Sequence, residues 1–191
     1  MKVRTPLIFA AILAADASAA NAQSVVSHGV GLAHECYLYA RAGNDPRGGV
    51  DVCNQSLKRE MLTIKDKAAT YDNRGVMLDT LGRVDDAEQD FHTAIALDPS
   101  LGDPYVNLGS MLIKKRRYQE ALDHINKGID LGMGFPHIGY YDRAVAEQLM
   151  GRYKEAYYDY KKVLELEPGY VQATERLKDF TVIRTPTRSP S

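Results

Sequence analysis

The sequence predicts an all-α protein made of stacked helical hairpins. One pattern of residues occurs three times, in segments that begin at Ala68, Gly102 and His137, at intervals of 34 and 35 residues. Within each segment the apolar residues recur at the spacing of one face of an α-helix. Because a single helical hairpin cannot bury its apolar face alone, the three copies are expected to stack around one continuous core.

The first copy shows the elements that we expect in every copy. A helix is predicted over 68–81 and ends at Gly82, because glycine readily adopts the left-handed conformation found at helix C-termini. A second helix is predicted over 84–97. It ends before Pro99, since the residue that precedes a proline disfavours the helical region.

A small residue occupies the same position in the first helix of each copy. These residues are Gly75, Gly109 and Ala144. So small a residue lets the second helix approach closely, and one large side chain per copy is expected to pack above it. These large residues are Phe91, Ile125 and Tyr160. The small residues therefore have a packing role, and no catalytic role is needed to explain them.

The full pattern resembles the tetratricopeptide repeat (TPR). The first copy has Tyr71-x-x-Arg74-Gly75-x-x-Leu78, then Ala87-x-x-x-Phe91-x-x-Ala94, then Pro99, and the other copies have equivalents. The resemblance implies a right-handed α-solenoid with repeats at 68–101, 102–136 and 137–169. The third copy departs from the family pattern at Arg143 and Glu147, where apolar residues are usual.

Residues 1–22 have the layout of a secretory signal peptide. Lys2 and Arg4 precede an apolar run over 7–15, and the segment ends in Ala20-Asn21-Ala22, an A-x-A cleavage site. The alternative is a membrane anchor, but the apolar run has about half the length of a spanning helix. We therefore expect cleavage near Ala22, a periplasmic or secreted location, and no integral membrane span in the mature chain.

The two cysteines lie within residues 23–67, which we interpret as a degenerate N-terminal repeat. Aligned on the TPR pattern, Cys36 and Cys53 occupy positions that face each other across a hairpin. Exported proteins form and keep disulfides, so an intramolecular Cys36–Cys53 bond is favoured. Two free thiols or a metal pair are the alternatives, although two ligands are too few for a typical metal site.

The remaining C-terminal residues are expected to close the array. Residues 170–183 keep helical spacing with a polar opposite face, which is typical of the capping helix that repeat arrays need. Residues 184–191 contain two prolines and two serines and are predicted to be a flexible tail.

Composition and motifs favour binding over catalysis. The formal net charge of −1 disfavours nucleic acid as a partner. The basic run 114–117 is either a solvated turn or a docking point for an acidic partner or lipid headgroups. The five histidines are scattered, and the catalytic and phosphate-binding motifs with fixed spacing are absent from the sequence. We predict no enzyme activity, no cofactor and no metal site.

The resemblance also suggests where a protein or peptide partner binds. In TPR folds the first helices of the repeats line a concave groove. The equivalent residues are Asp72, Asn73, Val76, Asp79, Asn107, Ser110, Lys114, Tyr141, Asp142 and Val145. Asn73 and Asn107 match a family position that often binds the backbone of an extended peptide. The aspartates argue against a groove that clamps the C-terminal carboxylate of a peptide, and they favour a neutral or basic peptide. The alternative is that these side chains are merely solvated.

Two tyrosines form a second candidate surface. Tyr157 and Tyr158 are not required by the packing pattern, so this aromatic flank is predicted to bind a partner or to join homo-oligomers. The sequence thus predicts an exported TPR adaptor or scaffold of a bacterial cell envelope. The alternatives are a non-catalytic subunit of an envelope enzyme or secretion complex, and a self-assembling structural protein.

Overall fold

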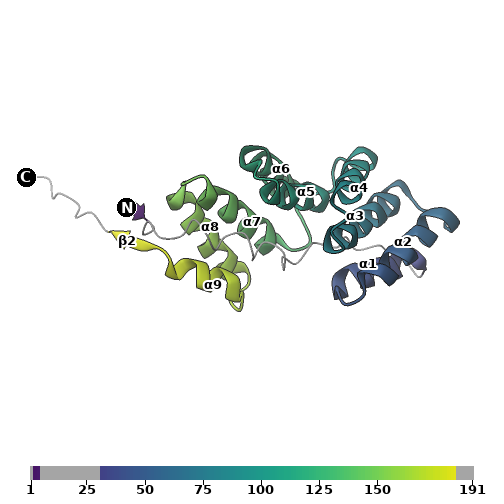
Figure 1. Cartoon of the computed structure of the whole chain (residues 1–191), viewed down its shortest axis with the longest axis horizontal. Coiled ribbons are helices and arrows are strands. Elements are labelled where there is room, and N and C mark those ends of the chain that lie inside the picture. Colours follow the sequence, from purple (N-terminus) through teal and green to yellow (C-terminus); the bar gives the residue numbers. More distant parts are fainter. Residues whose placement is uncertain (1, 5–30, 184–191) are drawn as a thin grey trace, which may run out of the picture.

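The computed structural model describes residues 2–4 and 31–183, and helices dominate this part of the chain (Figure 1). Their bounds are α1 Leu32–Ala42, α2 Pro46–Arg59, α3 Ile64–Thr80, α4 Val84–Leu97, α5 Asp103–Lys114, α6 Tyr118–Leu131, α7 Pro136–Leu149, α8 Tyr153–Leu166 and α9 Val171–Lys178. Apart from residues 2–4, the predicted signal peptide lies outside the described residues, and so does the predicted tail over 184–191.

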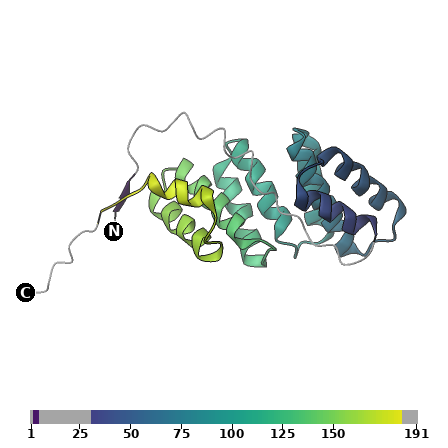
Figure 2. The same cartoon turned by 90° about the horizontal axis from the view of Figure 1, so that it is seen from below.

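The helices pair into four hairpins that stack into an elongated α-solenoid (Figures 1 and 2). In each hairpin the first helix packs on the second, so α1 contacts α2, α3 contacts α4, α5 contacts α6, and α7 contacts α8. The first helices also touch one another from α1 to α7, and they form one layer of the array. We call α3, α5 and α7 the A helices, and α4, α6 and α8 the B helices. The predicted all-α solenoid is confirmed.

Each A helix ends in the same backbone motif. The N–H groups of Arg83, Arg117 and Arg152 bond the carbonyls of Leu78, Leu112 and Glu147, which are five residues earlier. This is the Schellman motif, and it requires a left-handed residue directly before the donor. That residue is Gly82 in the first repeat and Gly151 in the third, with φ of 74° and 75°, but it is Arg116 in the second, with φ of 60°.

The small residues on the A helices set the distance to the B helices. A Cβ atom added to Gly75 would lie 2.7 Å from the Phe91 ring, and one added to Gly109 would lie 2.4 Å from Ile125. Both contacts are too short for real atoms, so these positions do not tolerate a side chain. The predicted close approach is confirmed, and Phe91, Ile125 and Tyr160 are all buried.

A disulfide joins Cys36 of α1 to Cys53 of α2, with the two Cα atoms 4.9 Å apart. Both cysteines are fully buried between the helices of the first hairpin. Cys36 also lies against the next repeat, where its sulfur approaches the carbonyl of Thr70. The covalent link therefore sits in the core of the first hairpin and borders the second.

The C-terminal end differs from the expected helix over 170–183. α9 ends at Lys178, and the following turn places Phe180 in the core, against the rings of Tyr157 and Tyr160. The chain then forms strand β2 (Thr181–Ile183), which pairs antiparallel with strand β1 (Lys2–Arg4) in the register Val3 to Val182. The prediction of a helix to 183 is wrong because β-branched residues favour an extended backbone.

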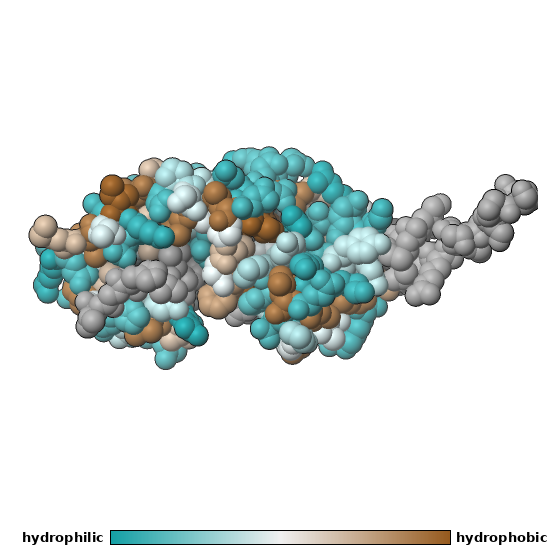
Figure 3. All heavy atoms as spheres, turned by 180° about the vertical axis from the view of Figure 1, so that it is seen from behind, coloured by the Kyte–Doolittle hydropathy of each residue, from teal (hydrophilic) through white to brown (hydrophobic). Residues whose placement is uncertain are grey.

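The solvent-facing surface mixes polar and apolar residues. On the side shown in Figure 3, apolar residues are scattered among hydrophilic ones instead of gathering at one place. Among the described residues, no helix combines the length and apolar character that crossing a bilayer requires.

Candidate partner-binding surface

The ten predicted groove residues all lie on the A helices. The structure buries seven of them, leaves two partly exposed and exposes one. The buried residues are Asp72, Asn73, Val76, Asn107, Tyr141, Asp142 and Val145, the partly exposed ones are Asp79 and Ser110, and the exposed one is Lys114. Seven of the ten predicted groove residues are therefore covered by neighbouring parts of the array, and three remain accessible.

Polar contacts between neighbouring A helices account for much of this burial. The side-chain amide of Asn107 donates to Asp72 Oδ1 over 2.9 Å, and the hydroxyl of Ser110 donates to Asp142. These pairs link α3 to α5 and α5 to α7. Packed helices lie only about 8–10 Å apart, so polar side chains one repeat apart can reach each other. Whether these residues also contact a partner stays a prediction.

Two buried aspartates on this face carry shifted pKa values. Burial, together with the nearby charge of Asp103, raises the pKa of Asp72 well above its usual range. Its Oδ2 atom has no hydrogen-bond partner within the described part of the chain. Burial also raises the pKa of Asp142 to about 6, although Ser110 and Lys114 favour its charged form. The charge of the A-helix layer therefore depends on pH in the mildly acidic range.

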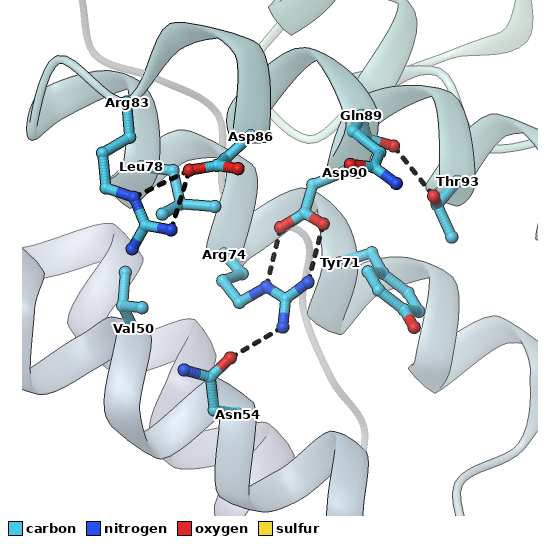
Figure 4. Close-up of a pocket in the computed structure, with 10 residues that line it drawn as sticks. All are labelled: Val50, Asn54, Tyr71, Arg74, Leu78, Arg83, Asp86, Gln89, Asp90 and Thr93. Carbon is cyan, nitrogen blue, oxygen red and sulfur yellow. Dashed lines mark hydrogen bonds and ion pairs between the residues drawn. The ribbon is translucent and has the colours of Figure 1, made fainter.

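A feature that sequence reasoning missed is an arginine clamp between repeats (Figure 4). Arg74 of α3 donates through Nε and Nη2 to the carboxylate of Asp90 on α4, each over 2.7 Å. Its Nη1 donates to Asn54 of α2 over 2.7 Å, and the guanidinium lies over the Tyr71 ring. One side chain thus joins the two helices of its own repeat to the preceding repeat.

The same clamp occurs in the third repeat. Arg143 of α7 donates to both oxygens of Asp159 over 2.6 and 2.9 Å, and to Asn126 of α6 over 2.9 Å. In the sequence, Arg143 looked like a departure from the family pattern. The signal that would have identified it is an arginine followed 16 residues later by an aspartate, which the first and third repeats share.

A cavity of about 320 Å³ surrounds the first clamp. Its lining residues, labelled in Figure 4, are Val50, Asn54, Tyr71, Arg74, Leu78, Arg83, Asp86, Gln89, Asp90 and Thr93. The two arginines of the lining pair with its two aspartates, Arg74 with Asp90 and Arg83 with Asp86. This cavity therefore offers a ligand polar contacts but little uncompensated charge.

The described ranges contain no group of three or more His, Cys, Asp or Glu side chains that could hold a metal ion. His92 and His124 interact electrostatically across neighbouring B helices, and this proximity, after burial, lowers the pKa of His124. Two imidazoles without a third ligand do not make a typical zinc site.

Family models described as tetratricopeptide repeat match three segments of the chain. The matched residues are 68–97, 102–131 and 137–170, which correspond to the three hairpins α3–α4, α5–α6 and α7–α8. The chain belongs to the tetratricopeptide repeat family.

Two curated proteins with TPR similarity give an idea of the range of relatives. The "Lipoprotein NlpI homolog" of Haemophilus influenzae is 31% identical over 96 residues, 50% of this chain and 30% of that protein. The "Hsp70-Hsp90 organizing protein" of Triticum aestivum is 30% identical over 101 residues, 51% of this chain and 17% of that protein. The match thus spans less than a third of the length of either relative.

Two solved TPR structures have a similar arrangement of helices. The second TPR domain of human RPAP3, determined in complex with the HSP70 peptide SGPTIEEVD, is 27% identical with a TM-score of 0.55. The similarity covers 61% of this chain and 96% of that domain. A MamA fragment from Desulfovibrio magneticus RS-1 is 19% identical with a TM-score of 0.55, over 73% of this chain and 75% of that one.

The basic run at the turn of the second TPR holds neighbouring repeats together. Lys114 pairs with Asp79 and Lys115 with Glu88, both in the first TPR, at 2.6 and 2.5 Å. Arg117 pairs with Glu120 of its own repeat. Three of the four cations therefore have carboxylate partners within the TPR array, which weakens the interpretation of this run as a docking point.

The two tyrosines of the predicted aromatic flank differ in their surroundings. Tyr157 is half-buried, and its ring centroid lies 5.7 Å from that of Tyr158 and 5.9 Å from that of Phe180. Tyr158 is 48% exposed at the C-terminal TPR. Tyr157 thus contributes to packing, and Tyr158 is the more accessible of the two.

Proposed function

We propose that this chain is an exported TPR adaptor of the cell envelope. It binds a segment of a partner protein on the layer of its A helices and performs no chemistry of its own. The observation that carries the proposal is the continuous row formed by α3, α5 and α7, whose accessible edge presents Asp79, Thr80, Ser110 and Lys114. Such a row offers spaced polar contacts to an extended polypeptide.

The comparisons support the binding part of this proposal. The RPAP3 domain, which this chain resembles at 27% identity, was solved with a bound peptide. That peptide ends in Glu-Glu-Val-Asp, whereas the A helices of this chain carry Asp72, Asp79, Asp103 and Asp142. Lys114 at the accessible edge is already paired with Asp79, so an acidic segment would have to compete for this cation, and a segment that is neutral or basic suits this chain better.

The envelope setting rests on three further observations. Residues 1–22 have the signal-peptide layout, and Cys36 and Cys53 form a disulfide, a bond that persists in oxidising compartments. A curated relative is also described as a lipoprotein homolog. These observations agree with export, and the mass of the N-terminus of the protein in an envelope fraction tests it directly.

The binding test compares one substitution at the accessible edge of the A helices with a matched control on a B helix, and both leave the buried contacts in place. Thr80→Arg places a bulky cation on the exposed C-terminal end of α3, and Gln89→Arg places the same side chain on an exposed position of α4. The full chain is expressed in its own host, cross-linked and captured from the envelope fraction. We expect a partner that is retained by Gln89→Arg and lost with Thr80→Arg. Equal retention by both variants would move the binding surface away from the A helices.

A further inference from the structure

The C-terminal end of the array is closed to another hairpin of the same kind. α9 takes the place of the next A helix, and its residue equivalent to Gly75, Gly109 and Ala144 is Lys178. This lysine is exposed and pairs with Glu175. At Gly75 and Gly109 even one added carbon would collide with the B helix, so no B helix can pack on α9 in the same way.

The end nevertheless presents an open cleft. A cleft of about 440 Å³ lies between α8 and the chain that follows it, and it is lined by Tyr157, Lys161, Leu164, Glu165, Leu177 and Phe180. The aromatic and leucine side chains provide an apolar interior, while Lys161 and Glu165 are exposed. The cleft therefore combines apolar contact area with one charge of each sign.

An extended segment already lies at this end. β2 begins directly after Phe180, and β1 pairs with it in antiparallel register while also lying against α8 (Figures 1 and 2). β1 belongs to the segment that the proposed export removes. The sheet in the described residues consists of β1 and β2, so once β1 is gone the backbone N–H and C=O groups of β2 lose their strand partner and can pair with another strand.

We propose that β2 and the adjoining α8–α9 cleft form a second binding surface, which takes an extended strand of a partner protein by strand addition. The strand pairs its backbone with β2 and carries an apolar residue at its centre, as β1 does with Val3. In the precursor β1 pairs with β2, and its removal frees the backbone of β2 beside the cleft, which is already open. The inference rests on the proposed export but is independent of the binding site on the A helices.

The test measures binding to the exported protein, purified from cells that express the full sequence and checked by mass for loss of residues 1–22. The probe is a fluorescent synthetic peptide of residues 1–6, Met-Lys-Val-Arg-Thr-Pro, followed by fluorescence anisotropy. We expect saturable binding to the exported protein. Binding to the full-length chain made without export should be at least about tenfold weaker, because β1 competes within the molecule.

Two neighbouring substitutions identify strand addition specifically. Successive residues of a strand point their N–H groups to opposite sides, and proline removes this group. Of Val182→Pro and Ile183→Pro, one should therefore raise the Kd of the probe about tenfold or more, and the other less than about threefold. Equal effects of the two prolines, or no effect of either, would overturn the inference.

The outcomes also separate this surface from the one on the A helices. Thr80→Arg should leave the Kd of the probe unchanged, and loss of probe binding in that variant would contradict two independent surfaces. If the working protein in the envelope retains residues 1–22, β2 stays covered and the inference fails. Capture of a partner through the A helices would be unaffected by that result.

Discussion

Arg143 holds both carboxylate oxygens of Asp159 across the third hairpin, and the same guanidinium reaches Asn126 of the preceding one. In the second repeat the equivalent residues are Leu108 and His124, which do not form such a pair. The joints on either side of the second repeat therefore differ: the one after it has an arginine clamp, whereas the one before it has the ion pairs of Lys114 with Asp79 and Lys115 with Glu88.

Removing the arginine of a clamp should destabilise the array. Arg143→Ala leaves Asp159, which is nearly buried, without its cation, and we expect a loss of about 2 kcal/mol in the free energy of unfolding by urea. The double variant Arg143→Leu with Asp159→His copies the second repeat and should recover at least half of the loss. A double variant as unstable as the single one would show that the ion pair is not the cause.

Replacing Arg116, whose backbone is in the left-handed conformation, with glycine should stabilise the protein. Arg116 has φ of 60°, where the equivalent residues are Gly82 and Gly151. A non-glycine residue pays about 1–2 kcal/mol for this conformation, and part of the gain is lost to the greater freedom of glycine in the unfolded chain. Arg116→Gly should therefore raise the urea midpoint by the equivalent of about 0.5–1 kcal/mol. Gly82→Ala is the matched control and should lower it.

The stability should fall as the pH rises through the mildly acidic range. Asp142 has a pKa of about 6 in the folded protein instead of 3.8, because it is buried. A raised carboxyl pKa means that the folded state binds the proton more tightly, so its stabilisation is complete below 3.8 and lost as the pH passes about 6.

Asp142→Asn should flatten this part of the stability profile by about 3 kcal/mol, and the profile is measured by urea unfolding across the range. The raised pKa values of Asp72 and of Glu147, the latter at about 7, act in the same direction and leave a residual slope. The exposed Asp130→Asn is the control, and an equal flattening in both variants would contradict the role of Asp142.

The disulfide should contribute most of its stabilisation through the unfolded chain. Cys36 and Cys53 close a loop with a sequence separation of 17, and a loop of this size is worth about 3 kcal/mol in the chain-entropy model. The double variant Cys36→Ala with Cys53→Ala should lose about that amount. A reducing agent should lower the stability of the wild type to a similar level and leave the double variant unchanged.

Substituting the two flank tyrosines one at a time should distinguish an effect on folding from an effect on association. Tyr157 packs on Phe180, so Tyr157→Ala should cost about 2 kcal/mol of stability, whereas Tyr158→Ala should cost little. If the flank joins molecules, Tyr158→Ala should shift the sedimentation profile toward smaller species. An unchanged profile at high protein concentration would exclude Tyr158 as an association contact.

The sequence was sufficient to predict the repeat architecture. The spacing of Gly75, Gly109 and Ala144 directly encodes the close approach of two helices, because only small residues fit there. The disulfide followed from the same register. These features depend on local spacing, which one sequence shows completely.

Contacts between repeats were harder to predict, because they depend on how far and at what angle one hairpin sits on the next. Ser110 and Asp142 are 32 residues apart, and only their stacking shows that they bond. The clamp of Arg74 likewise needs Asn54 from another hairpin. The β-branched run after Phe180 was a local signal against a helix to 183, but the place of Phe180 among the rings of Tyr157 and Tyr160 is a tertiary contact that the sequence does not show.

The position of the disulfide at one end of the array sets the order in which the hairpins unfold. A stack in which each hairpin touches only its neighbours comes apart from its free ends, and here only the first hairpin is covalently fastened. Unravelling under force or heat should then start at α9 and travel toward α1. The hairpin of α1 and α2, which the disulfide holds, should therefore unfold last, and limited proteolysis should leave it as the final resistant fragment.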